Sequence, residues 1–442
     1  MNLYDVAAAL NLEKPLYNFP LTGICIDSRQ VKPGNLFFAI RGERFDGHDF
    51  IDEAVSKGAA AVVCSRENAN PVFQLRVADT LKALADLACA HRRTLSCSII
   101  ALTGSNGKTT VKEMIASILP KPSFATPGNL NNHIGVPLSV LQINPTHRYG
   151  VLELGANHPG EIAHTVAIAK PKVTLINNIA PAHVEGFGSI EGVARAKGEI
   201  YQGLDSDGTA VINNDDDYRD FWNELLKGKK TLRFSRQSSE AIHARDIGFN
   251  DDGQARFKLV TPAGEASIQL QVAGMHNVSN ALAAAACAHA LDIPLADIAA
   301  GLCQFKGVSG RMTYRQGINQ SLIIDDTYNA NLRSVLSGLA VLAERKGRRI
   351  FVFGDMGELG EYTSAHHQEV GVEARRLGID SMLTVGVHSE LSSKAFGAGG
   401  KHYSSQSELV KELLPYLDCE TTVLVKGSRS SAMEKIVQQI IG

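Results

Sequence analysis

The sequence predicts an α/β protein of three domains, and three observations lead to that prediction. The chain has 442 residues, which is too long for a single compact core. Short apolar runs alternate with helical patterns along nearly the whole chain, as expected for parallel sheets with crossover helices. The alternation pauses at a Gly-rich, polar stretch at residues 305–320 and then restarts, which indicates a linker between two α/β units.

Ten apolar runs are expected to be strands. Most of them are continuous and rich in Val and Ile, which is typical of strands that are covered on both faces of a sheet. In chain order they are residues 35–40, 59–64, 98–103, 150–155, 173–179, 209–214, 322–327, 349–355, 382–386 and 422–428.

The predicted domains are residues 1–80, 81–311 and 312–442. A helix over residues 79–94 is expected to connect the first domain to the second, because its apolar residues fall on one helical face. The domain limits follow from this helix and from the polar stretch at 305–320. Limits read from a sequence in this way are accurate to several residues.

Composition and charge exclude several classes of protein. The formal net charge is -2, so no basic field favours nucleic acid. No apolar run is long enough to span a bilayer, and the N-terminus lacks the pattern of a signal peptide, so we expect a cytoplasmic protein without membrane insertion. The seven cysteines are scattered singly, as in a reduced protein without a metal finger. No separate dimerisation element is visible, and we expect a monomer.

The stretch TGSNGKTT at residues 103–110 has the pattern of a phosphate-binding loop between a strand and a helix. Gly104 and Gly107 allow backbone conformations in which amide N–H groups point inward. The helix that follows has one apolar stripe, and its N-terminus adds partial positive charge. Lys108 supplies a cation for phosphates and Thr109 a hydroxyl suited to Mg²⁺. The spacing is shorter than in the common G-x-x-x-x-G-K-[ST] loop, because Leu102 stands where its first glycine would be.

Other residues of the central domain allow two interpretations each. Glu153 ends an apolar run, so it either holds Mg²⁺ at the carboxyl edge of the sheet or terminates a strand. His183 and Lys197 are either functional or ordinary structural and surface residues. Asn277 and Asn280 lie one turn apart at the start of an Ala-rich helix, where they could cap the helix or bind a purine edge.

Taken together, these stretches resemble the Mur ligase family, whose short loop T-G-x-[NS]-G-K-[TS] is TGSNGKTT here. The resemblance extends over nearly the whole chain. Within the family, the sequence is similar to the branch that adds D-alanyl-D-alanine. The motif Asp-Asn-Pro-Arg and the ending Gly-Lys-Gly-His-Glu of the relative that adds the third amino acid are absent from the sequence. The supporting stretches are residues 27–51, 128–141, 153–162, 182–189, 194–200, 325–334, 354–360 and 424–430.

The resemblance implies a fold and a reaction. It implies a small UDP-sugar-binding α/β domain at the N-terminus, a central P-loop ATPase domain with a parallel sheet, and a C-terminal Rossmann-like α/β domain that binds dipeptide and nucleotide. The implied reaction is ATP-dependent, Mg²⁺-dependent ligation of D-alanyl-D-alanine to UDP-N-acetylmuramoyl-tripeptide through an acyl phosphate. The product is the pentapeptide precursor of peptidoglycan, which serves cell wall biogenesis, cell shape and cell division.

The resemblance also implies roles for individual residues. Lys108, His183 and Lys197 would be catalytic, and Lys197 resembles a lysine that relatives carry as a carbamate. The implied metal ligands are Thr109, Glu153, His183 and Lys197. The implied nucleotide-binding residues are Gly104, Ser105, Asn106, Gly107, Lys108, Thr109, Thr110, Asn277, Arg311 and Asp326. The implied UDP-sugar contacts are Ser28, Arg29, Asn129, Asn131 and His133, and the implied dipeptide contacts are Tyr328, Asn329, Asn331, Asp355, Lys426, Ser428 and Arg429.

Two alternatives to this reaction remain at this point. The chain could be another ATP-dependent amide ligase, such as one that adds glutamate to folate, although such an enzyme would lack the stretch at residues 27–50. It could also be a nucleotide-dependent switch, although the guanine-reading motif Asn-Lys-x-Asp is absent from the sequence.

The stretch YNANLRS at residues 328–334 departs from relatives, because Leu-Arg stands where small residues or Pro are common.

Overall fold

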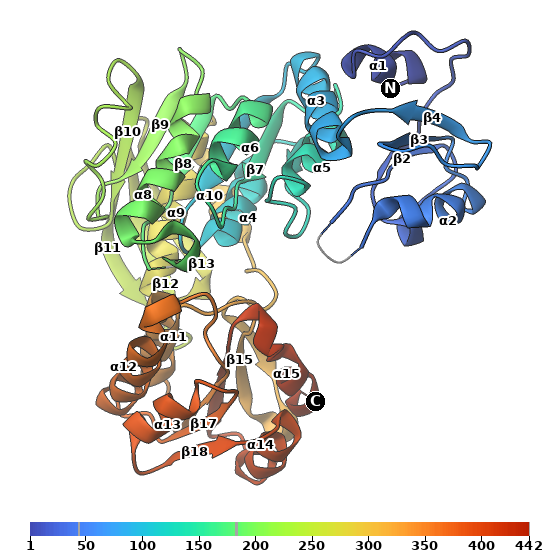
Figure 1. Ribbon diagram of the computed structural model, residues 1–442. Coiled ribbons are helices and arrows are strands. Elements are labelled where there is room, and N and C mark those ends of the chain that lie inside the picture. The colour runs from blue at the N-terminus through green and yellow to red at the C-terminus, as the bar shows by residue number, and fades with distance from the viewer. Residues whose placement is uncertain (43–44, 182–183, 442) are drawn as a thin grey trace.

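The computed structural model describes residues 1–42, 45–181 and 184–441. Its strands form three sheets of four, nine and six strands, which lie in the N-terminal, central and C-terminal parts of the described chain. Figure 1 shows the N-terminal part beside the central part, with the C-terminal part below it. The predicted three-domain α/β fold class is confirmed, although the domain limits themselves stay a prediction.

The N-terminal sheet is parallel, and apolar side chains cover both of its faces. Along β2, Leu36 and Phe38 enter one hydrophobic cluster while Phe37 enters another, because alternate side chains of a strand point to opposite faces. The elements are α1 (Leu3–Ala9), β1 (Gly23–Cys25), β2 (Asn35–Phe38), α2 (Ile51–Ser56), β3 (Ala61–Cys64) and β4 (Phe73–Arg76).

Helix α3 (Thr80–Arg93) connects the first sheet to the second, as predicted. The Asp79 side chain caps its N-terminus by accepting from the backbone N–H of Leu81 at 2.8 Å. Leu84 and Leu87 pack in the N-terminal core, whereas Ala88 packs in the core of the central sheet. One helix therefore belongs to two hydrophobic cores.

The central sheet has the strand order β13-β12-β11-β10-β9-β8-β5-β7-β6. The strands from β5 to β11 pair in parallel, as predicted for β5, β7, β8 and β9. Strands β6 and β10 and the antiparallel pairing of β11, β12 and β13 were not predicted. Residues of β12 and much of β13 alternate between buried and exposed, as in a sheet with one solvated face. The bounds are β5 (Ser98–Thr103), β6 (Ser123–Ala125), β7 (Tyr149–Glu153), β8 (Val173–Ile176), β9 (Thr209–Asn213), β10 (Lys230–Ser235), β11 (Ile242–Phe249), β12 (Gln254–Thr261) and β13 (Gly264–Ala273).

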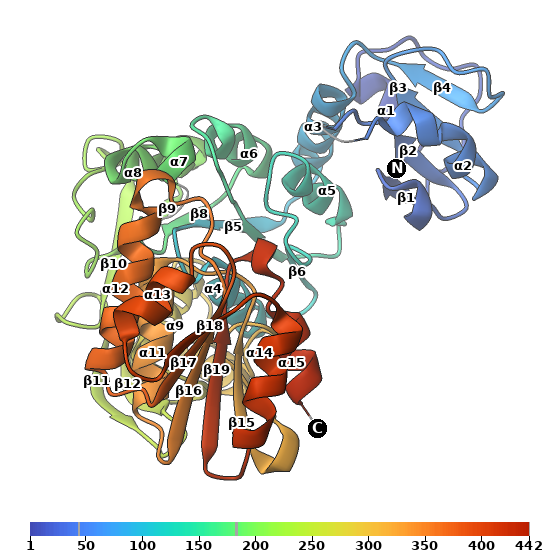
Figure 2. The same ribbon diagram turned by 60° about the horizontal axis from the view of Figure 1, so that its bottom comes forward.

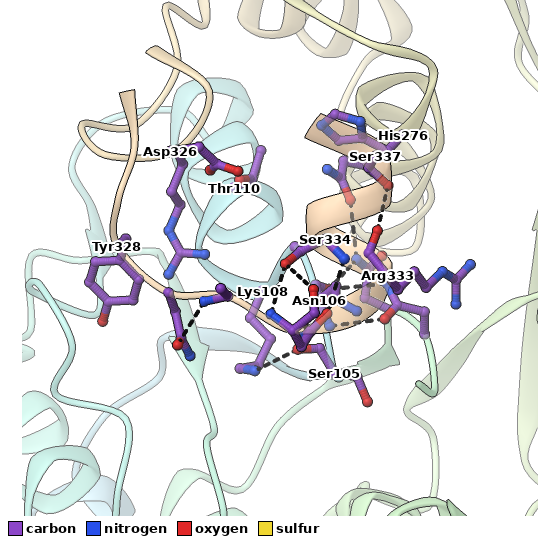
Figure 3. Close-up of a pocket in the computed structure, with 18 of the residues that line it drawn as sticks. Ser105, Asn106, Lys108, Thr110, His276, Asp326, Tyr328, Arg333, Ser334 and Ser337 are labelled. Carbon is purple, nitrogen blue, oxygen red and sulfur yellow. Dashed lines mark hydrogen bonds between the residues drawn. The ribbon is translucent and has the colours of Figure 1, made fainter. Parts of the chain in front are cut away.

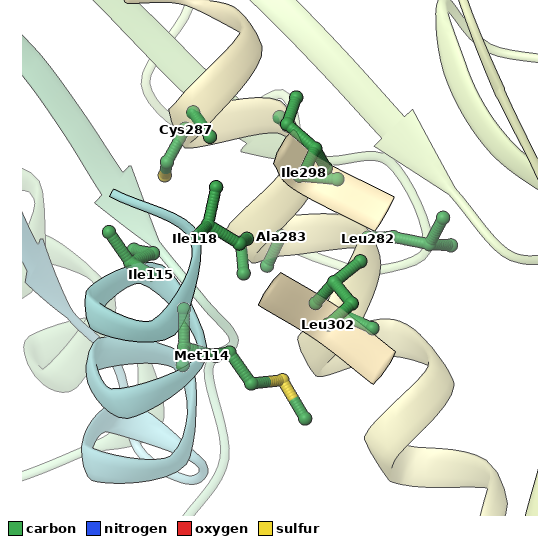
Figure 4. Close-up of a cluster of buried hydrophobic side chains, with 14 of the residues drawn as sticks. Met114, Ile115, Ile118, Leu282, Ala283, Cys287, Ile298 and Leu302 are labelled. Carbon is green, nitrogen blue, oxygen red and sulfur yellow. The ribbon is translucent and has the colours of Figure 1, made fainter. Parts of the chain in front are cut away.

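Helix α4 begins at Lys108 and packs on the Ala-rich helix α9, as Figure 4 shows. Met114, Ile115 and Ile118 form the apolar stripe that the sequence predicts. They meet Ala283 and Cys287, whose small side chains let the two helices approach closely. The central helices are α4 (Lys108–Ile118), α5 (Gly135–Gln142), α6 (Glu161–Ala169), α7 (Val184–Phe187), α8 (Ile190–Gly198), α9 (Met275–His289) and α10 (Leu295–Gln304).

The C-terminal sheet has the order β14-β15-β19-β16-β17-β18, and helices cover both faces (Figure 2). Helices α11, α12 and α13 pack on one face, and α14 and α15 pack on the other. Strand β14 is antiparallel and begins within the stretch expected to be a linker. The bounds are β14 (Thr313–Gln316), β15 (Leu322–Asp326), α11 (Leu332–Ala343), β16 (Arg348–Phe353), α12 (Thr363–Arg376), β17 (Ser381–Val385), α13 (Glu390–Phe396), β18 (Gly400–Tyr403), α14 (Gln406–Leu413), β19 (Thr421–Lys426) and α15 (Glu434–Ile440).

All ten predicted strands are present, and most of them end one to three residues earlier than expected because the last residues turn into loops. No helix in the described part of the chain is both long and apolar enough to cross a bilayer.

Candidate active site

A cavity of about 960 Å³ lies between the central and C-terminal sheets. Polar residues at the carboxyl ends of strands line it, which is where open α/β sheets place ligands. Lys108 follows β5 and Glu153 ends β7 on the central side, while Asp326 ends β15 and Lys426 ends β19 on the C-terminal side. Figure 3 shows Ser105, Asn106 and Lys108 opposite Arg333 and Ser334 of α11.

The loop after β5 has the backbone that its glycines allow. Gly104 has φ of 152° and Gly107 has φ of 76°, in the region that favours glycine. A Cβ atom on Gly107 would lie 2.6 Å from Oδ1 of Asn280, so a side chain there has no room. The chain then enters α4, whose first residue is Lys108.

Two asparagines at the end of β8 hold the loop. Asn178 accepts from the backbone N–H of Asn106 through Oδ1 and from that of Ser105 through its carbonyl, both at 2.9 Å. Asn177 donates from Nδ2 to the carbonyl oxygen of Asn106 at 2.9 Å. Neither residue was predicted to have a role, and the signal in the sequence is a pair of amide side chains near the end of the strand predicted at residues 173–179.

Lys108 is half-buried at the base of the loop, and its Nζ donates to the carbonyl oxygen of Gly104 at 2.7 Å. Burial lowers the pKa of Lys108, and the nearby carboxylate of Glu153 opposes that shift. A cation that is poorly solvated in the protein gains the most from an anionic ligand, which fits the predicted phosphate role.

Glu153 is 2% exposed, and its carboxylate connects α4 to Asn131. Its Oε2 accepts from Oγ1 of Thr109 at 2.9 Å, and its Oε1 accepts from Nδ2 of Asn131 at 2.8 Å. Arg311 donates from Nη2 to Oγ1 of Thr109 at 2.9 Å. A hydroxyl and a carboxylate therefore meet beside the loop, and both are oxygen ligands of the kind Mg²⁺ prefers.

Lys197 is 1% exposed at the end of α8, and its Nζ lies 6.0 Å from the centre of the Phe187 ring. Burial, followed by the charge of Lys108, lowers the pKa of Lys197 well below its ordinary value. The buried position agrees with a role inside the protein and excludes the alternative of a solvated surface lysine. The predicted ligand His183 lies outside the described residues.

The C-terminal side of the cavity contains a buried ion pair. Nζ of Lys426 lies 2.5 Å from Oδ2 of Asp326 and donates to the carbonyl oxygen of Asn329 at 2.9 Å. Burial raises the pKa of Asp326, although the charge of Lys426 opposes the shift. The Arg311 guanidinium lies 4.2 Å from the centre of the Tyr328 ring, which places both side chains at the junction of the two sheets.

Two polar contacts join the start of α11 to the central unit, one to the phosphate loop and one to the segment after β8. Asn331 donates from Nδ2 to Oδ1 of Asn106 at 2.6 Å, and Arg333 donates from Nη1 to the carbonyl oxygen of Ile179 at 3.2 Å. Asn331 also caps α11 by accepting from the backbone N–H of Ser334. Arg333 was noted in the sequence only as a departure from relatives, and the structure places it in the cavity wall.

Asn277 lines the cavity at the start of α9, together with His276. Its Nδ2 donates to the carbonyl oxygen of Ala273 at 2.8 Å, and its Oδ1 accepts from Nδ2 of Asn280 at 3.0 Å. These contacts differ from a helix cap, in which the side chain accepts from backbone N–H groups. Burial lowers the pKa of His276, which the sequence analysis did not select, to about 4, so its ring is neutral near pH 7.

The structure brings only some of the predicted UDP-sugar residues to this cavity. Asn131 and His133 line it, whereas Ser28, Arg29 and Asn129 are outside its lining. The Ser28 hydroxyl donates to Oε2 of Glu53 at 2.6 Å, and exposed Arg29 pairs with Asp27 at 2.8 Å.

The remaining predicted dipeptide residues lie along the C-terminal wall. Ser428 and Arg429 line the main cavity, and Asp355 lines an adjoining cavity of about 400 Å³. Burial alone would raise the pKa of Asp355, but hydrogen bonds from the backbone N–H groups of residues 387–389 outweigh it and lower the pKa.

The fold and the site define an α/β protein in which two α/β units assemble a cavity around a glycine-rich loop of the phosphate-binding type. Models of the Mur ligase family match three parts of the chain. The family's catalytic domain matches residues 20–92, its middle domain residues 102–288, and its glutamate ligase domain residues 310–429. The chain therefore belongs to the Mur ligase family, as its sequence motifs predict, and is a ligase that forms C–N bonds.

Several relatives match this chain over nearly its full length. The UDP-N-acetylmuramoyl-tripeptide--D-alanyl-D-alanine ligase of Escherichia coli (strain K12) is 42% identical over 445 residues, which span 100% of this chain and 98% of that one. The crystal structure of MurF from Acinetobacter baumannii has a TM-score of 0.91 at 36% identity, covering 98% of this chain and 97% of that chain. MurF ligase from Thermotoga maritima in complex with ADP has a TM-score of 0.82 at 29% identity, covering 94% and 96%.

Proposed function

We propose that this chain joins D-alanyl-D-alanine to UDP-N-acetylmuramoyl-tripeptide at the expense of ATP, forming the pentapeptide precursor of peptidoglycan. The names of its full-length relatives support this reaction, and the ADP in the complex of one relative supports ATP as the nucleotide. The observation that carries the proposal is the cavity in which Lys108 and the phosphate loop face the C-terminal residues Asp326 and Lys426. Such a cavity can hold a nucleotide and an acyl acceptor together.

The reaction needs an activated carboxylate, because a carboxylate and an amine do not form an amide in water. The terminal carboxylate of the UDP-linked tripeptide attacks the γ-phosphorus of ATP, the bond to the bridging oxygen breaks, and ADP leaves. The free amine of the dipeptide then attacks the acyl carbon and loses a proton, and phosphate leaves with the electrons of the C–O bond. Lys108 and the loop N–H groups disperse the negative charge on the phosphoryl group during transfer.

The oxygen atoms of Thr109 and Glu153 fit Mg²⁺, because a buried hydroxyl and a buried carboxylate meet there within hydrogen-bond distance. When bound, Mg²⁺ screens the charge of the phosphate oxygens and orients them. We assign the second metal position to Glu153, His183 and Lys197. A carbamate on Lys197 would supply two further oxygens, and it forms only on a neutral amine, which the lowered pKa of Lys197 favours.

Arg311 of the linker and residues of the C-terminal unit would complete the site when the units close on their substrates. Arg311 already contacts Thr109, and Asn331 already contacts Asn106, so both side chains lie beside the loop to which we assign the nucleotide phosphates. We assign adenine to Asn277 and ribose to Asp326. Closure of this kind excludes water, which would otherwise hydrolyse the acyl phosphate.

The three predicted domains would each bring one substrate. We assign the UDP-sugar to residues 1–80 with Ser28 and Arg29, the nucleotide to residues 81–311, and the dipeptide to residues 312–442. The remaining proposed UDP-sugar contacts are Asn129, Asn131 and His133, and the proposed dipeptide contacts are Tyr328, Asn329, Asn331, Asp355, Lys426, Ser428 and Arg429. We also propose that the protein acts as a monomer in the cytoplasm, where ATP is available.

Phosphate release from Mg-ATP tests the proposal directly. We expect release only when both UDP-N-acetylmuramoyl-tripeptide and D-alanyl-D-alanine are present. Release that requires another amino acid in place of the dipeptide would make the chain a different ligase of the family. Release that depends on neither acceptor would remove the ligase reaction and leave a nucleotide-hydrolysing protein.

A further inference from the structure

The segment at residues 356–360 borders both cavities. Gly357, Glu358 and Leu359 line the main cavity, and the whole segment lines the adjoining one. Glu185 of the central unit lines the adjoining cavity too, and a Cβ atom on Gly360 would lie 3.9 Å from its Cβ. The segment therefore lies close to α7 of the central unit, beside the adjoining cavity.

The backbone of this segment is bent sharply. Glu358 has φ of 61°, which is uncommon for a residue with a side chain, and Gly360 has φ of 55°. A backbone of this kind persists only where surrounding contacts hold it. The side chains of Met356 and Leu359 are buried in the C-terminal core, but no regular helix or strand fixes the backbone of the segment before the turn at Gly360.

Asp355 holds the start of the segment. Its carboxylate accepts from the backbone N–H groups of Val387, His388 and Ser389 at 2.8, 3.0 and 2.8 Å. Its own carbonyl oxygen accepts from the N–H of Ser428 at 2.8 Å. Both sides of Asp355 are therefore fixed to neighbouring loops.

His367 holds the next residue. It lies on α12 and is 0% exposed, and its Nε2 is 3.0 Å from the backbone nitrogen of Met356. Its Nδ1 is 2.7 Å from the carbonyl oxygen of Thr363. Because that carbonyl can only accept, Nδ1 carries the proton and the lone pair of Nε2 faces the Met356 N–H. The ring lies 5.9 Å from the Phe353 ring and 5.8 Å from the His388 ring, which restrict its rotation.

We infer that His367 is a positioning residue that fixes the 356–360 segment at the border of the substrate cavity. It touches neither cavity itself and acts through the N–H of Met356. The inference rests on the proposed function only for its kinetic consequence, which is that a released segment weakens dipeptide binding. That His367 fixes the 356–360 segment applies to the protein without any substrate.

The contact depends on the charge of the ring. Burial lowers the pKa of His367, while the carbonyl of Thr363 and the charge of Asp355 oppose that shift, and His388 and His366 add to it. Protonation puts an N–H donor on Nε2, directly against the Met356 N–H. The 356–360 segment is therefore released when the pH falls below the ordinary range of a histidine, and it is held when the ring is neutral.

Two substitutions separate the contact from the bulk of the side chain. His367→Gln places an amide oxygen near the position of Nε2 and can still accept from Met356, whereas His367→Asn reaches only the position of Nδ1. The first measurement is amide hydrogen exchange of a peptide spanning residues 355–361 in the full-length protein without ligands. We expect exchange at least 10-fold faster than wild type in His367→Asn and within 2-fold of wild type in His367→Gln, at pH 7.5.

The second measurement is steady-state kinetics on the same proteins. We expect His367→Asn to raise the KM for D-alanyl-D-alanine at least 10-fold while the KM for ATP stays within 2-fold. Equal effects of both variants, or unchanged exchange in His367→Asn, would overturn the inference. If His367→Asn does not fold, the test is the pH dependence of exchange, corrected for its intrinsic rate. Wild type should then exchange faster at acid pH and His367→Gln should not, and identical profiles would overturn the inference. If wild type shows no dipeptide-dependent activity, the proposed function fails and the exchange result still decides the role of His367.

Discussion

The two walls of the active-site cavity handle charge in opposite ways. On the central side, Lys108 donates to a backbone carbonyl, and burial together with the charge of Arg311 lowers its pKa although the carboxylate of Glu153 opposes the shift. On the C-terminal side, the charge of Lys426 is paired with the carboxylate of Asp326. The central wall is therefore suited to an external anion, whereas on the C-terminal wall the charges of Lys426 and Asp326 are already paired within the protein.

Lys108→Ala should give the largest effect and tests the central wall. We expect phosphate release to fall by about 10³-fold or more, because a cation that faces the transferring phosphoryl group is lost. The melting temperature should not fall, since the lowered pKa means that charged Lys108 opposes folding rather than supporting it. Exposed Lys121 follows the same helix, and Lys121→Ala is the matched control for removal of a lysine. Activity of Lys108→Ala within a few-fold of wild type would exclude the phosphate role.

Lys426→Met tests the C-terminal wall. Removing the partner leaves a buried carboxylate at Asp326, and we expect a loss of about 3–5 kcal/mol in the free energy of unfolding. Urea unfolding followed by circular dichroism measures it. In the double variant Lys426→Met with Asp326→Leu, most of the stability should return, because no charge is left unpaired. A single variant as stable as wild type would show that the pair is not what neutralises this wall.

Lys197→Ala tests the central wall further, because the proposed carbamate would put an anion in place of the buried amine of Lys197. We expect activity to fall about 10–100-fold, as for loss of a group that supports a metal site. Short carboxylic acids such as acetate should restore part of the activity by supplying the missing oxygens. Full activity without added acid would mean that Lys197 has only a packing role.

Asn331→Ser tests the contact between the two walls and should give the smallest effect. Serine can still cap α11, but it cannot reach Asn106, so only the bond between the units is lost. One neutral hydrogen bond is worth about 0.5–1.5 kcal/mol, and we expect kcat/KM to fall about 3–10-fold. Asn331→Ala, which also loses the cap, is the comparison variant. If Asn331→Ser matches wild type while Asn331→Ala is impaired, the residue matters only as a cap.

The local parts of the site could be predicted from the sequence. The phosphate loop is one continuous stretch, and Gly104, Gly107 and Lys108 carry its conformation and charge by themselves. The strands themselves could be predicted, although most end one to three residues earlier than expected, and the end of one apolar run placed Glu153 at the carboxyl edge of its sheet. Periodicity is a local signal, so these features can be predicted without knowing which distant residues contact them in the fold.

The parts that depend on distant partners could not be predicted. Asp326 and Lys426 are 100 residues apart, and only the parallel pairing of β15 with β19 brings them together. Asn178 holds the phosphate loop because β8 lies beside β5, which no pattern in either strand reveals. The antiparallel strands β11–β13 were missed because half of their residues are polar, so they lack the continuous apolar runs of the parallel strands.

The helix shared by two cores limits how this protein can be divided. A cut at residue 80 would remove Leu84 and Leu87 from the N-terminal core, and a cut after α3 would remove Ala88 from the central one. Either fragment would expose an apolar surface and tend to aggregate. A chimera that exchanges the N-terminal unit with that of a relative therefore has to carry α3 and the face on which it packs, so the smallest unit for transplantation is larger than the sheet it contains.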